Sequence, residues 1–313
     1  MLKAAHENRT LALSFIIVGF ETIRKTEIFL FFLFLCMYIV TMAAHILIIG
    51  LVILDHQLHK PMYMFLANFS VAEIFYISTT MPKMLDALLT RNKEISYSGC
   101  IAQFYGFFSF GATEHCFLVV MGYDRYVAIC HPLHYYSMMA KKISHGLAIG
   151  AWTGGLLAAA APALWVSSLN FCYPNLIDHF FCDYAPLLKL SCEDTSKGEF
   201  TFTVISWSVI LGCFLLTLVS YAFIIFSVLK IPSVEGQKKA FSTCASHIIV
   251  VSIFDGTVIF MYIRPTSNIR FTIDKVVSIF YSTVTPLLNP IIYCLRNKDV
   301  KNALYKGLQW FGI

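Results

Sequence analysis

Seven long apolar stretches, separated by short polar segments, make up most of this 313-residue sequence. Each stretch approaches or exceeds the ~20 residues that an α-helix needs to cross the hydrocarbon of a bilayer. Charged residues account for 13% of the chain, whereas a soluble domain carries about a quarter. The pattern predicts an all-α membrane protein, a bundle of seven transmembrane helices with no separate soluble domain. The expected spans are Ile28–Leu54, Pro61–Leu89, Cys100–Ile129, Ile143–Val166, Phe200–Leu229, Ala240–Ile263 and Ile273–Leu295.

Two sequence features, rather than the charge balance, predict how the bundle is oriented. The 23 Lys and Arg residues divide almost equally between the two sides, so the positive-inside rule decides nothing. The triplet Asn8-Arg9-Thr10 is an N-glycosylation acceptor, which is meaningful only if residues 1–27 lie outside the cell. Four cysteines on that same side predict two disulfides, with three alternative pairings. They are Cys100, Cys172, Cys182 and Cys192.

Charged residues at the inner end of the third span point to a signalling switch rather than to an enzyme. In MGYDRYVAIC at 121–130, Asp124 and Arg125 lie where the helix leaves the membrane, beside Tyr126. Charge is costly at the centre of a bilayer, but at the rim it can be satisfied and can act. Arg125 offers five donors in a rigid fork. It can therefore pair with Asp124 at rest and be released towards a partner; a permanent structural ion pair is the alternative.

Six segments, in the right order and on the expected helices, carry a family resemblance. They are LHKPMYMFLANFS at 58–70, MGYDRYVAIC at 121–130, the cysteine-bearing loop at 171–195, SY at 220–221, KAFSTCASH at 239–247 and PLLNPIIYCLRN at 286–297. From Asn8 to Leu304 the sequence resembles the vertebrate odorant receptors, the olfactory branch of the rhodopsin-like G-protein-coupled receptors. The resemblance implies a receptor, not an enzyme, that binds small volatile odorants and raises cyclic AMP through a stimulatory heterotrimeric G protein. It also implies a multi-pass protein of the plasma membrane in the sensory cilia of olfactory neurons.

The resemblance divides the chain into an extracellular tail at 1–27, a seven-transmembrane receptor domain at 28–295 and a cytoplasmic tail at 296–313. In the last part, apolar residues repeat at helical spacing among lysines. This spacing predicts a short amphipathic helix that lies on the inner leaflet. The apolar positions are Val300, Leu304, Leu308 and Phe311.

Similar receptors open the inner ends of their helices to admit the G protein. Within helix 7, Asn289-Pro290 removes a backbone hydrogen bond and predicts a kink. One turn further, Tyr293 can swing towards Arg125, as can Tyr221 on helix 5. The predicted switch residues are Asp124, Arg125, Tyr126, Tyr221, Asn289, Pro290 and Tyr293.

The carboxyl groups of Glu73 and Glu114 lie inside the spans, where an unpaired charge is costly. Counting along helices 2 and 3 puts both groups ~16–18 Å from the inner rim, so they can face each other. Two carboxylates that close need a shared proton or a cation. In similar receptors a sodium ion lies around these positions. The alternative is a protonated pair, hydrogen-bonded to His115 or Asn289 without an ion; no other cofactor is expected.

A mostly apolar cavity with a few polar groups, as small-ligand sites usually have, is expected in the outer half of the bundle. Its unusual member is Asp255, because similar receptors commonly carry a tyrosine there. A carboxylate predicts a preference for an amine odorant, and a neutral acid bonded to helix 3 or helix 7 is the alternative. The predicted ligand-binding residues are Phe104, Phe107, Phe108, Gly111, Ala112, Ile205, Ser206, Val209, Asp255, Val258, Ile259, Tyr262, Ile279 and Ser282.

The resemblance also assigns the disulfides as Cys100–Cys182 and Cys172–Cys192, which would pin the loop at 167–199 across the mouth of the cavity as a lid. On helix 1, His45 stands where the family usually has an asparagine. A histidine can replace the asparagine's hydrogen bonds to helices 2 and 7, but it is larger and can take up a proton.

Three other functions compete with an odorant receptor. The nearest is a receptor for a non-odorant small molecule in another tissue, which would use the same residues. A secondary transporter would show internal repeats and paired broken helices, but only helix 7 has a strong Asn-Pro break. An intramembrane aspartyl protease would need two facing aspartates, and Asp255 has no aspartate counterpart at its depth. No phosphate-cradling glycine loop supports nucleotide chemistry.

Overall fold

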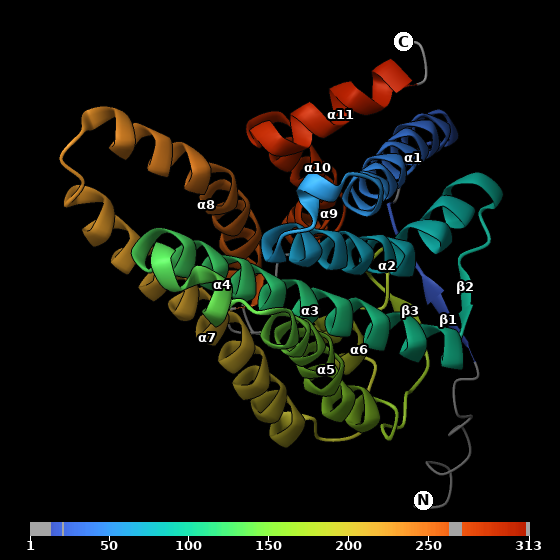
Figure 1. The fold of residues 1–313 in the computed structure, drawn as a ribbon. Coiled ribbons are helices and arrows are strands. Elements are labelled where there is room, and N and C mark those ends of the chain that lie inside the picture. The colour runs from blue at the N-terminus through green and yellow to red at the C-terminus, as the bar shows by residue number, and fades with distance from the viewer. Residues whose placement is uncertain (1–13, 21, 263–270, 311–313) are drawn as a thin grey trace, which may run out of the picture.

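The long helices coincide with the predicted apolar stretches. The computed structural model describes residues 14–20, 22–262 and 271–310. Several helices begin about a turn before the apolar stretch, because backbone hydrogen bonding continues into the polar flanks where hydropathy has already fallen. The bundle consists of α1 (Arg24–Leu54), α2 (Pro61–Thr90), α3 (Tyr97–Cys130), α5 (Lys141–Val166), α7 (Ser196–Leu229), α8 (Val234–Tyr262) and the run α9 (Phe271–Ile279), η4 (Phe280–Val284) and α10 (Thr285–Arg296) (Figure 1).

Shorter elements connect these helices or follow them. They are the 3₁₀ turns η1 (His56–Leu58) and η2 (Pro132–His134), and the helices α4 (Tyr135–Met138), α6 (Tyr184–Leu188) and α11 (Lys298–Trp310).

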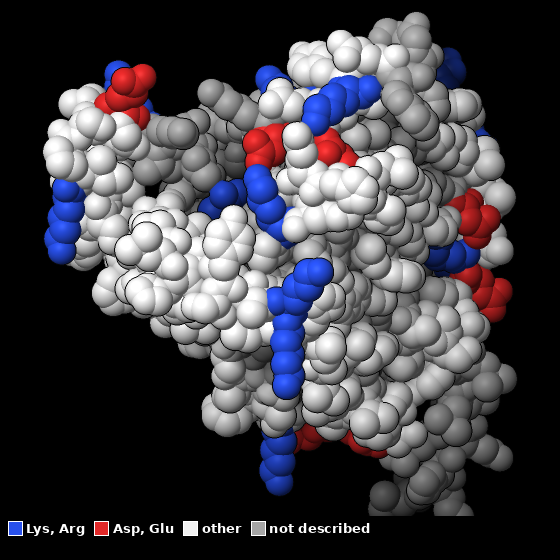
Figure 2. Space-filling view, viewed as in Figure 1, with Lys and Arg blue, Asp and Glu red and all other residues white. Residues whose placement is uncertain are grey.

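The bundle has the dimensions and surface of a membrane protein. Five of the described helical runs are long and apolar enough to cross a bilayer, namely α1, α3, α5, α7 and Asp274–Tyr293. Within α8 lies a shorter apolar helix, His247–Ile259, and the 30 residues of α2 give ~45 Å of helix. Large apolar side chains such as Phe32 and Phe226 are exposed, and charged side chains are sparse on the face shown in Figure 2. The predicted helical membrane architecture is confirmed.

A small sheet at one end of the bundle is an addition to the predicted all-α fold. It contains β1 (Ser14–Ile17), β2 (Glu94–Ser96) and β3 (Leu176–Ile177) in the order β2-β1-β3. Strand β1 pairs antiparallel with β2 and parallel with β3. Part of the extracellular tail expected at 1–27 therefore ties two interhelical loops together (Figure 1). The glycosylation acceptor Asn8 lies outside the described residues. We call this end of the molecule the sheet end.

The opposite end carries Arg125, and we call it the Arg125 end. There α11 packs against the bundle through Val300 and Ala303, which are buried. The Asp299 carboxylate accepts hydrogen bonds from Tyr63 Oη (2.8 Å) and Lys60 Nζ (3.1 Å). The predicted amphipathic helix is thus present from Lys298 to Trp310; the side chain of Leu308, and Phe311, lie outside the described part of the chain.

The irregular part of the last transmembrane helix lies elsewhere than expected. Asn289-Pro290 was expected to interrupt it, but α10 continues through Pro290 from Thr285 to Arg296. The departure from α-helical geometry is the π-helical segment η4, where Thr285 Oγ1 donates to the Phe280 carbonyl (3.0 Å). Proline at an internal position removes one amide donor without ending the helix, whereas π segments are frequent at functional sites.

Helix α1 is tied to α10 by the histidine that departs from the family pattern. His45 is buried, and its Nε2 lies 3.0 Å from the Pro286 carbonyl. Because a carbonyl only accepts, Nε2 carries the proton. This is the predicted bond to helix 7. Among the described residues no hydrogen bond joins His45 to α2, so that half of the expectation is wrong.

Candidate functional site

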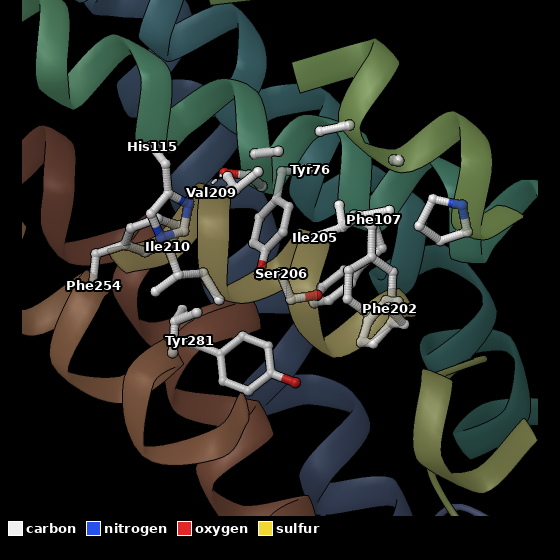
Figure 3. Close-up of a pocket in the computed structure, with 17 residues that line it drawn as sticks. Tyr76, Phe107, His115, Phe202, Ile205, Ser206, Val209, Ile210, Phe254 and Tyr281 are labelled. Carbon is white, nitrogen blue, oxygen red and sulfur yellow. Dashed lines mark hydrogen bonds between the residues drawn. The ribbon is translucent and has the colours of Figure 1, made fainter. Parts of the chain in front are cut away.

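A cavity of about 80 Å³ lies inside the bundle (Figure 3). Helices α2, α3, α5, α7 and α8 and the segment η4 surround it, and almost its entire lining is apolar. The lining residues are Tyr76, Phe107, Phe108, Gly111, Ala112, His115, Ala158, Ala159, Pro162, Phe202, Ile205, Ser206, Val209, Ile210, Phe254, Val258 and Tyr281.

More than half of the predicted ligand-binding residues lie in this lining, because helical spacing on α3 and α7 identifies the stripe that faces inward. They are Phe107, Phe108, Gly111, Ala112, Ile205, Ser206, Val209 and Val258. The others lie elsewhere. Phe104 is buried in the apolar cluster under the sheet, Ile259 and Ile279 pack on the main core, and Ser282 Oγ donates to the Ser278 carbonyl (2.5 Å). The Tyr262 side chain lies outside the described residues.

The lining residues on α5 were not predicted from the sequence. Ala158, Ala159 and Pro162 carry no polar or aromatic group that would single them out. Their small size is what leaves space between α5 and α7. Tyr281 was also missed, since it lies on the π-helical segment, where α-helical spacing does not apply.

The polar floor of the cavity is a buried pair of side chains from two helices. His115 Nε2, on α3, lies 3.3 Å from Asp255 Oδ1, on α8. Its other nitrogen, Nδ1, lies 2.8 Å from the Gly111 carbonyl and must therefore donate. Since a buried net charge is costly, the pair is most stable with one further proton, as imidazolium with carboxylate or as imidazole with carboxylic acid, neither of which has a net charge.

Asp255 itself is not one of the residues that line the cavity, whereas His115, which contacts it, is. The carboxyl group thus contacts helix 3. This agrees with the sequence interpretation in which Asp255 bonds to helix 3 or helix 7, rather than with the one in which it binds an amine odorant. The 3.3 Å contact is not aligned as a hydrogen bond, and both His115 Nε2 and Asp255 Oδ1 remain without one. Two buried atoms with unused hydrogen-bonding capacity at the end of an apolar cavity can bind a polar group of a ligand.

A second polar group in the lining is the Ser206 hydroxyl. Serine and threonine hydroxyls in helices commonly bond to the carbonyl four residues earlier, as Ser208 does with Val204 (2.7 Å). Among the described residues Ser206 Oγ has no such partner, and it is partly exposed to the cavity (Figure 3). It can therefore donate to a ligand.

A roof over the cavity is built from the loop between α5 and α7. The disulfides Cys100–Cys182 and Cys172–Cys192 form as expected from the resemblance. Gln103 Oε1 also accepts from the Cys182 amide (2.9 Å), so the loop is anchored twice on α3. The Phe181 ring lies 4.6 Å from that of Phe107, which lines the cavity directly below.

Polar contacts connect the roof to the last transmembrane helix. Lys275 Nζ lies 2.5 Å from Asp178 Oδ1, and His179 Nε2 lies 3.2 Å from Ser278 Oγ. The Ser278 hydroxyl lies 3.1 Å from Tyr281 Oη, at the edge of the cavity. Burial, together with the charge of Lys275, lowers the pKa of His179 to about 3, so this histidine is neutral in the folded roof.

Glu73 and Glu114 meet in the middle of the bundle. Asn289 Nδ2 donates to Glu73 Oε1, and the two carboxyl groups interact electrostatically. The remaining Glu73 oxygen, both Glu114 oxygens, Asn289 Oδ1 and Ser70 Oγ are buried without a hydrogen-bond partner. Oxygen atoms of this kind are the ligands that a hard cation prefers, so these residues fit a sodium ion. His115 pairs with Asp255 instead of either glutamate. In the described part of the chain, no three His, Cys, Asp or Glu side chains converge as a ligand set for a metal ion.

At the Arg125 end, the acid–base pair of the sequence is not an ion pair. Among the described residues Asp124 forms none; it accepts a hydrogen bond from Tyr135 Oη (2.8 Å) on α4. Arg125 Nε is buried without a partner. The pairing expected for a resting state is therefore absent here, because Tyr135 occupies the carboxylate. Tyr135 was missed, since nothing in the sequence directs a loop tyrosine towards α3.

Two of the other predicted switch residues, Tyr221 and Tyr293, lie near Arg125. Its positive charge acts on Tyr221, Tyr293 and a histidine that was not predicted, His247. Tyr221 Oη lies 2.7 Å from His247 Nδ1, and Tyr293 Oη is buried without a hydrogen bond. Tyr126 packs against the cluster that contains Tyr221, and its Oη lies 3.0 Å from His131 Nε2. The only sequence signal for His247 was its place at the end of the KAFSTCASH segment.

Comparisons with known proteins agree with the motifs. The family described as olfactory receptor matches residues 34–309. Human olfactory receptor 6F1 is 45% identical over 305 residues, which cover 97% of this chain and 98% of that protein. Human olfactory receptor 6B1 is 46% identical over 300 residues, or 96% of each chain. The likeness therefore extends over nearly the full length, cavity and Arg125 end included.

Proposed function

Because this chain belongs to the olfactory receptor family of G-protein-coupled receptors, we propose that the apolar cavity is its odorant site and that the Arg125 end engages the G protein. The protein is a multi-pass membrane receptor that detects odorants, and it is not an enzyme. In this proposal the sheet end faces outside, with Asn8 glycosylated, and the receptor works in the plasma membrane of sensory cilia. Coupling is to a stimulatory G protein that raises cyclic AMP.

One observation carries the assignment of the cavity. Its walls are apolar, its floor is the buried His115–Asp255 pair, and a roof anchored by Cys100–Cys182 covers it. Small-molecule sites combine an apolar enclosure with a few fixed polar groups in this way. A small volatile molecule gains free energy by leaving water for such walls and is oriented by its single polar group.

The finer part of the proposal is a preference for amines. A neutral amine that reaches the floor can take the proton held between His115 and Asp255. The products are an ammonium ion paired with the Asp255 carboxylate and a neutral imidazole, so protons and charge balance. Net neutrality of the occupied floor is thereby kept. Alcohols would instead be held by Ser206, whose hydroxyl is free among the described residues.

A cyclic AMP screen of amines, alcohols and carboxylic acids, with wild type and Asp255→Asn side by side, tests this preference. A hydrogen bond to a charged group contributes ~1.5–3 kcal/mol, so Asp255→Asn should weaken amine potency by about 10- to 100-fold. Ser206→Ala is the matched control, and it should affect alcohols more than amines. Unchanged amine potency in Asp255→Asn, at normal surface expression, contradicts the amine assignment.

We also propose a sodium ion between Glu73 and Glu114, where unpaired buried oxygens gather. If a sodium ion binds there between one carboxylate and one protonated carboxyl group, replacing sodium chloride by choline chloride should change agonist potency in wild type. The double variant Glu73→Gln, Glu114→Gln should lose that dependence. Equal sodium dependence in both proteins would show that the ion acts somewhere else.

A further inference from the structure

One side of the cavity is open, and it lies between transmembrane helices rather than at the roof. Among the described residues, every lining side chain from α2, α8 and η4 is buried. The partly exposed lining residues all belong to α3, α5 and α7. They are Phe108, Gly111, Ala112, Ala158, Ile205, Ser206 and Val209. Exposure confined to one side identifies where the cavity opens.

The roof blocks the route from the water on the outside. Phe180, Phe181, Cys182 and Asp183 are all buried, and the segment is held by the disulfide to Cys100. A molecule that came this way would have to displace a segment that is covalently anchored to α3. The opening must therefore be sought below the roof.

The gap between α5 and α7 is closed at its outer end. A Cβ atom added to Gly198 would lie 1.7 Å from the Trp165 ring, so these two residues touch as closely as a glycine permits. Just inside, the Tyr184 ring stacks on Phe202 with centroids 3.5 Å apart. These contacts separate the cavity from the outer water on this side as well.

One to two turns deeper, the same gap is lined by Ala158 and Pro162 on α5 and by Ile205 and Ser206 on α7. Ala158 lies eight residues before the end of α5 at Val166, or ~12 Å along the helix. The hydrocarbon of a bilayer is ~30 Å thick, so the opening lies in its outer half. Leu157 and Val204, beside the opening, are exposed as lipid-facing residues are.

We propose that odorants enter the cavity sideways, from the outer leaflet of the membrane, through the opening between α5 and α7. The inference rests on the proposed function, since it takes the cavity as the odorant site. Apolar molecules leave water for hydrocarbon, so they are concentrated in the layer onto which the opening faces. The roof can then stay closed throughout, which explains why it is fixed by two disulfides.

Two neighbouring alanines on α5 allow a matched test. Ala161 is exposed, lies one turn from Ala158 and is on the side of α5 where Trp165 meets α7. Ala160 lies ~100° round the helix from Ala161. It is two turns from Trp152, which is on the side of α5 that faces α2, since Trp152 Nε1 donates to Asn68 of α2 (3.1 Å). Ala161→Trp therefore places a large ring at the opening, whereas Ala160→Trp places the same ring on the opposite edge.

The probe is 3-trifluoromethyl-3-phenyldiazirine, a small apolar photolabel that partitions into bilayers. Full-length receptor in nanodiscs is mixed with the probe and irradiated after increasing delays, and labelled residues are located by mass spectrometry. In wild type and Ala160→Trp, the buried cavity residues Phe254 and Val258 should be labelled early. In Ala161→Trp that labelling should slow about tenfold, or ~1.4 kcal/mol in the barrier, and reach the same extent at long delay.

Equal final labelling would show that the cavity is intact, and unchanged labelling of lipid-facing Phe32 would show equal probe in the bilayer. Ser208→Trp, which approaches the opening from α7, gives a second plug should the first variant express poorly. Equal rates in all the proteins overturn sideways entry. Sideways entry is also contradicted if the cavity residues are never labelled in wild type. If that wild-type protein still responds to an odorant, only the entry route is wrong and the receptor function stands.

Discussion

The two ends of the bundle are held together in different ways. At the sheet end, two disulfides, a sheet of three distant segments and the Lys275–Asp178 ion pair fix the roof. At the Arg125 end, the contacts are non-covalent among the described residues, such as the hydrogen bond from Tyr135 to Asp124 and the exposed ion pair of Lys60 with Asp299. Buried polar atoms there remain unsatisfied. One end is fastened covalently, and the other is held by contacts that can be exchanged.

The difference indicates where the molecule can change shape. A buried polar group without a partner costs ~1–3 kcal/mol, so Arg125 Nε and Tyr293 Oη would gain free energy in an arrangement that satisfies them. Breaking the roof, in contrast, requires breaking a covalent bond. We therefore expect ligand binding in the cavity to move the helices at the Arg125 end.

The largest effect should come from opening the roof. Cys182→Ser removes a bond that closes 82 residues, for which chain entropy gives about 4–5 kcal/mol, whereas Cys192→Ser opens 20 residues and costs about 3 kcal/mol. Surface expression and thermal inactivation in nanodiscs should fall in that order. If both variants kept wild-type stability, the contrast between a fixed and an exchangeable end would be wrong.

A smaller effect is expected from the contact that holds Asp124. Tyr135→Phe removes the 2.8 Å hydrogen bond, and a bond to a charged group contributes ~1.5–3 kcal/mol. Basal cyclic AMP should rise, because the resting arrangement loses this amount while an arrangement in which Asp124 has another partner does not. Tyr136→Phe, at the exposed neighbouring tyrosine, is the control. The same basal activity in both variants would show that Tyr135 does not hold the resting state.

Acid should loosen the roof through His179. Its pKa is lowered from 6.5 to about 3 by burial and by Lys275. Below pH 6.5, His179 is therefore protonated in the unfolded chain but stays neutral in the folded roof. Stability is complete above pH 6.5 and falls as the pH drops towards 3, by ~1.4 kcal/mol at pH 5.5. Melting temperatures at pH 7.5 and 5.5 should therefore differ more in wild type than in His179→Asn. If His179→Asn kept the full pH dependence of the melting temperature, the loss of stability in acid would come from other groups.

The smallest effect should follow loss of the ion pair above the roof. Lys275→Met removes the contact to Asp178, which is about half exposed. Exposed pairs contribute ~0.2–1 kcal/mol, so the melting temperature should drop only slightly, and less at high salt. A loss as large as that of Cys192→Ser would mean that the roof depends on charge rather than on covalent bonds.

Features that depend on spacing along one helix were predictable. The residues of α3 and α7 that line the cavity repeat at helical intervals, and the chain resembles a family in which the disulfide pairing is known. The predicted helices also matched, because a membrane span requires an apolar stretch of fixed length.

Features that depend on two segments meeting were not predictable in the same way. Strand β1 is only four residues long and forms because segments near 95 and 176 lie beside it. The same holds for Tyr135 against Asp124 and for His115 in front of Asp255. The π-helical segment η4 brings Tyr281 to the cavity by shifting the helical register, which spacing arguments assume to be constant.

The central claim is that a ligand held under the roof acts through Arg125 at the other end. The most direct test compares Arg125→Gln with wild type, using the strongest agonist of the screen, at equal surface expression. The thermal stabilisation that the agonist gives should be kept, because the cavity is unchanged, and the cyclic AMP response should be lost. An agonist-driven response equal to that of wild type would contradict the claim.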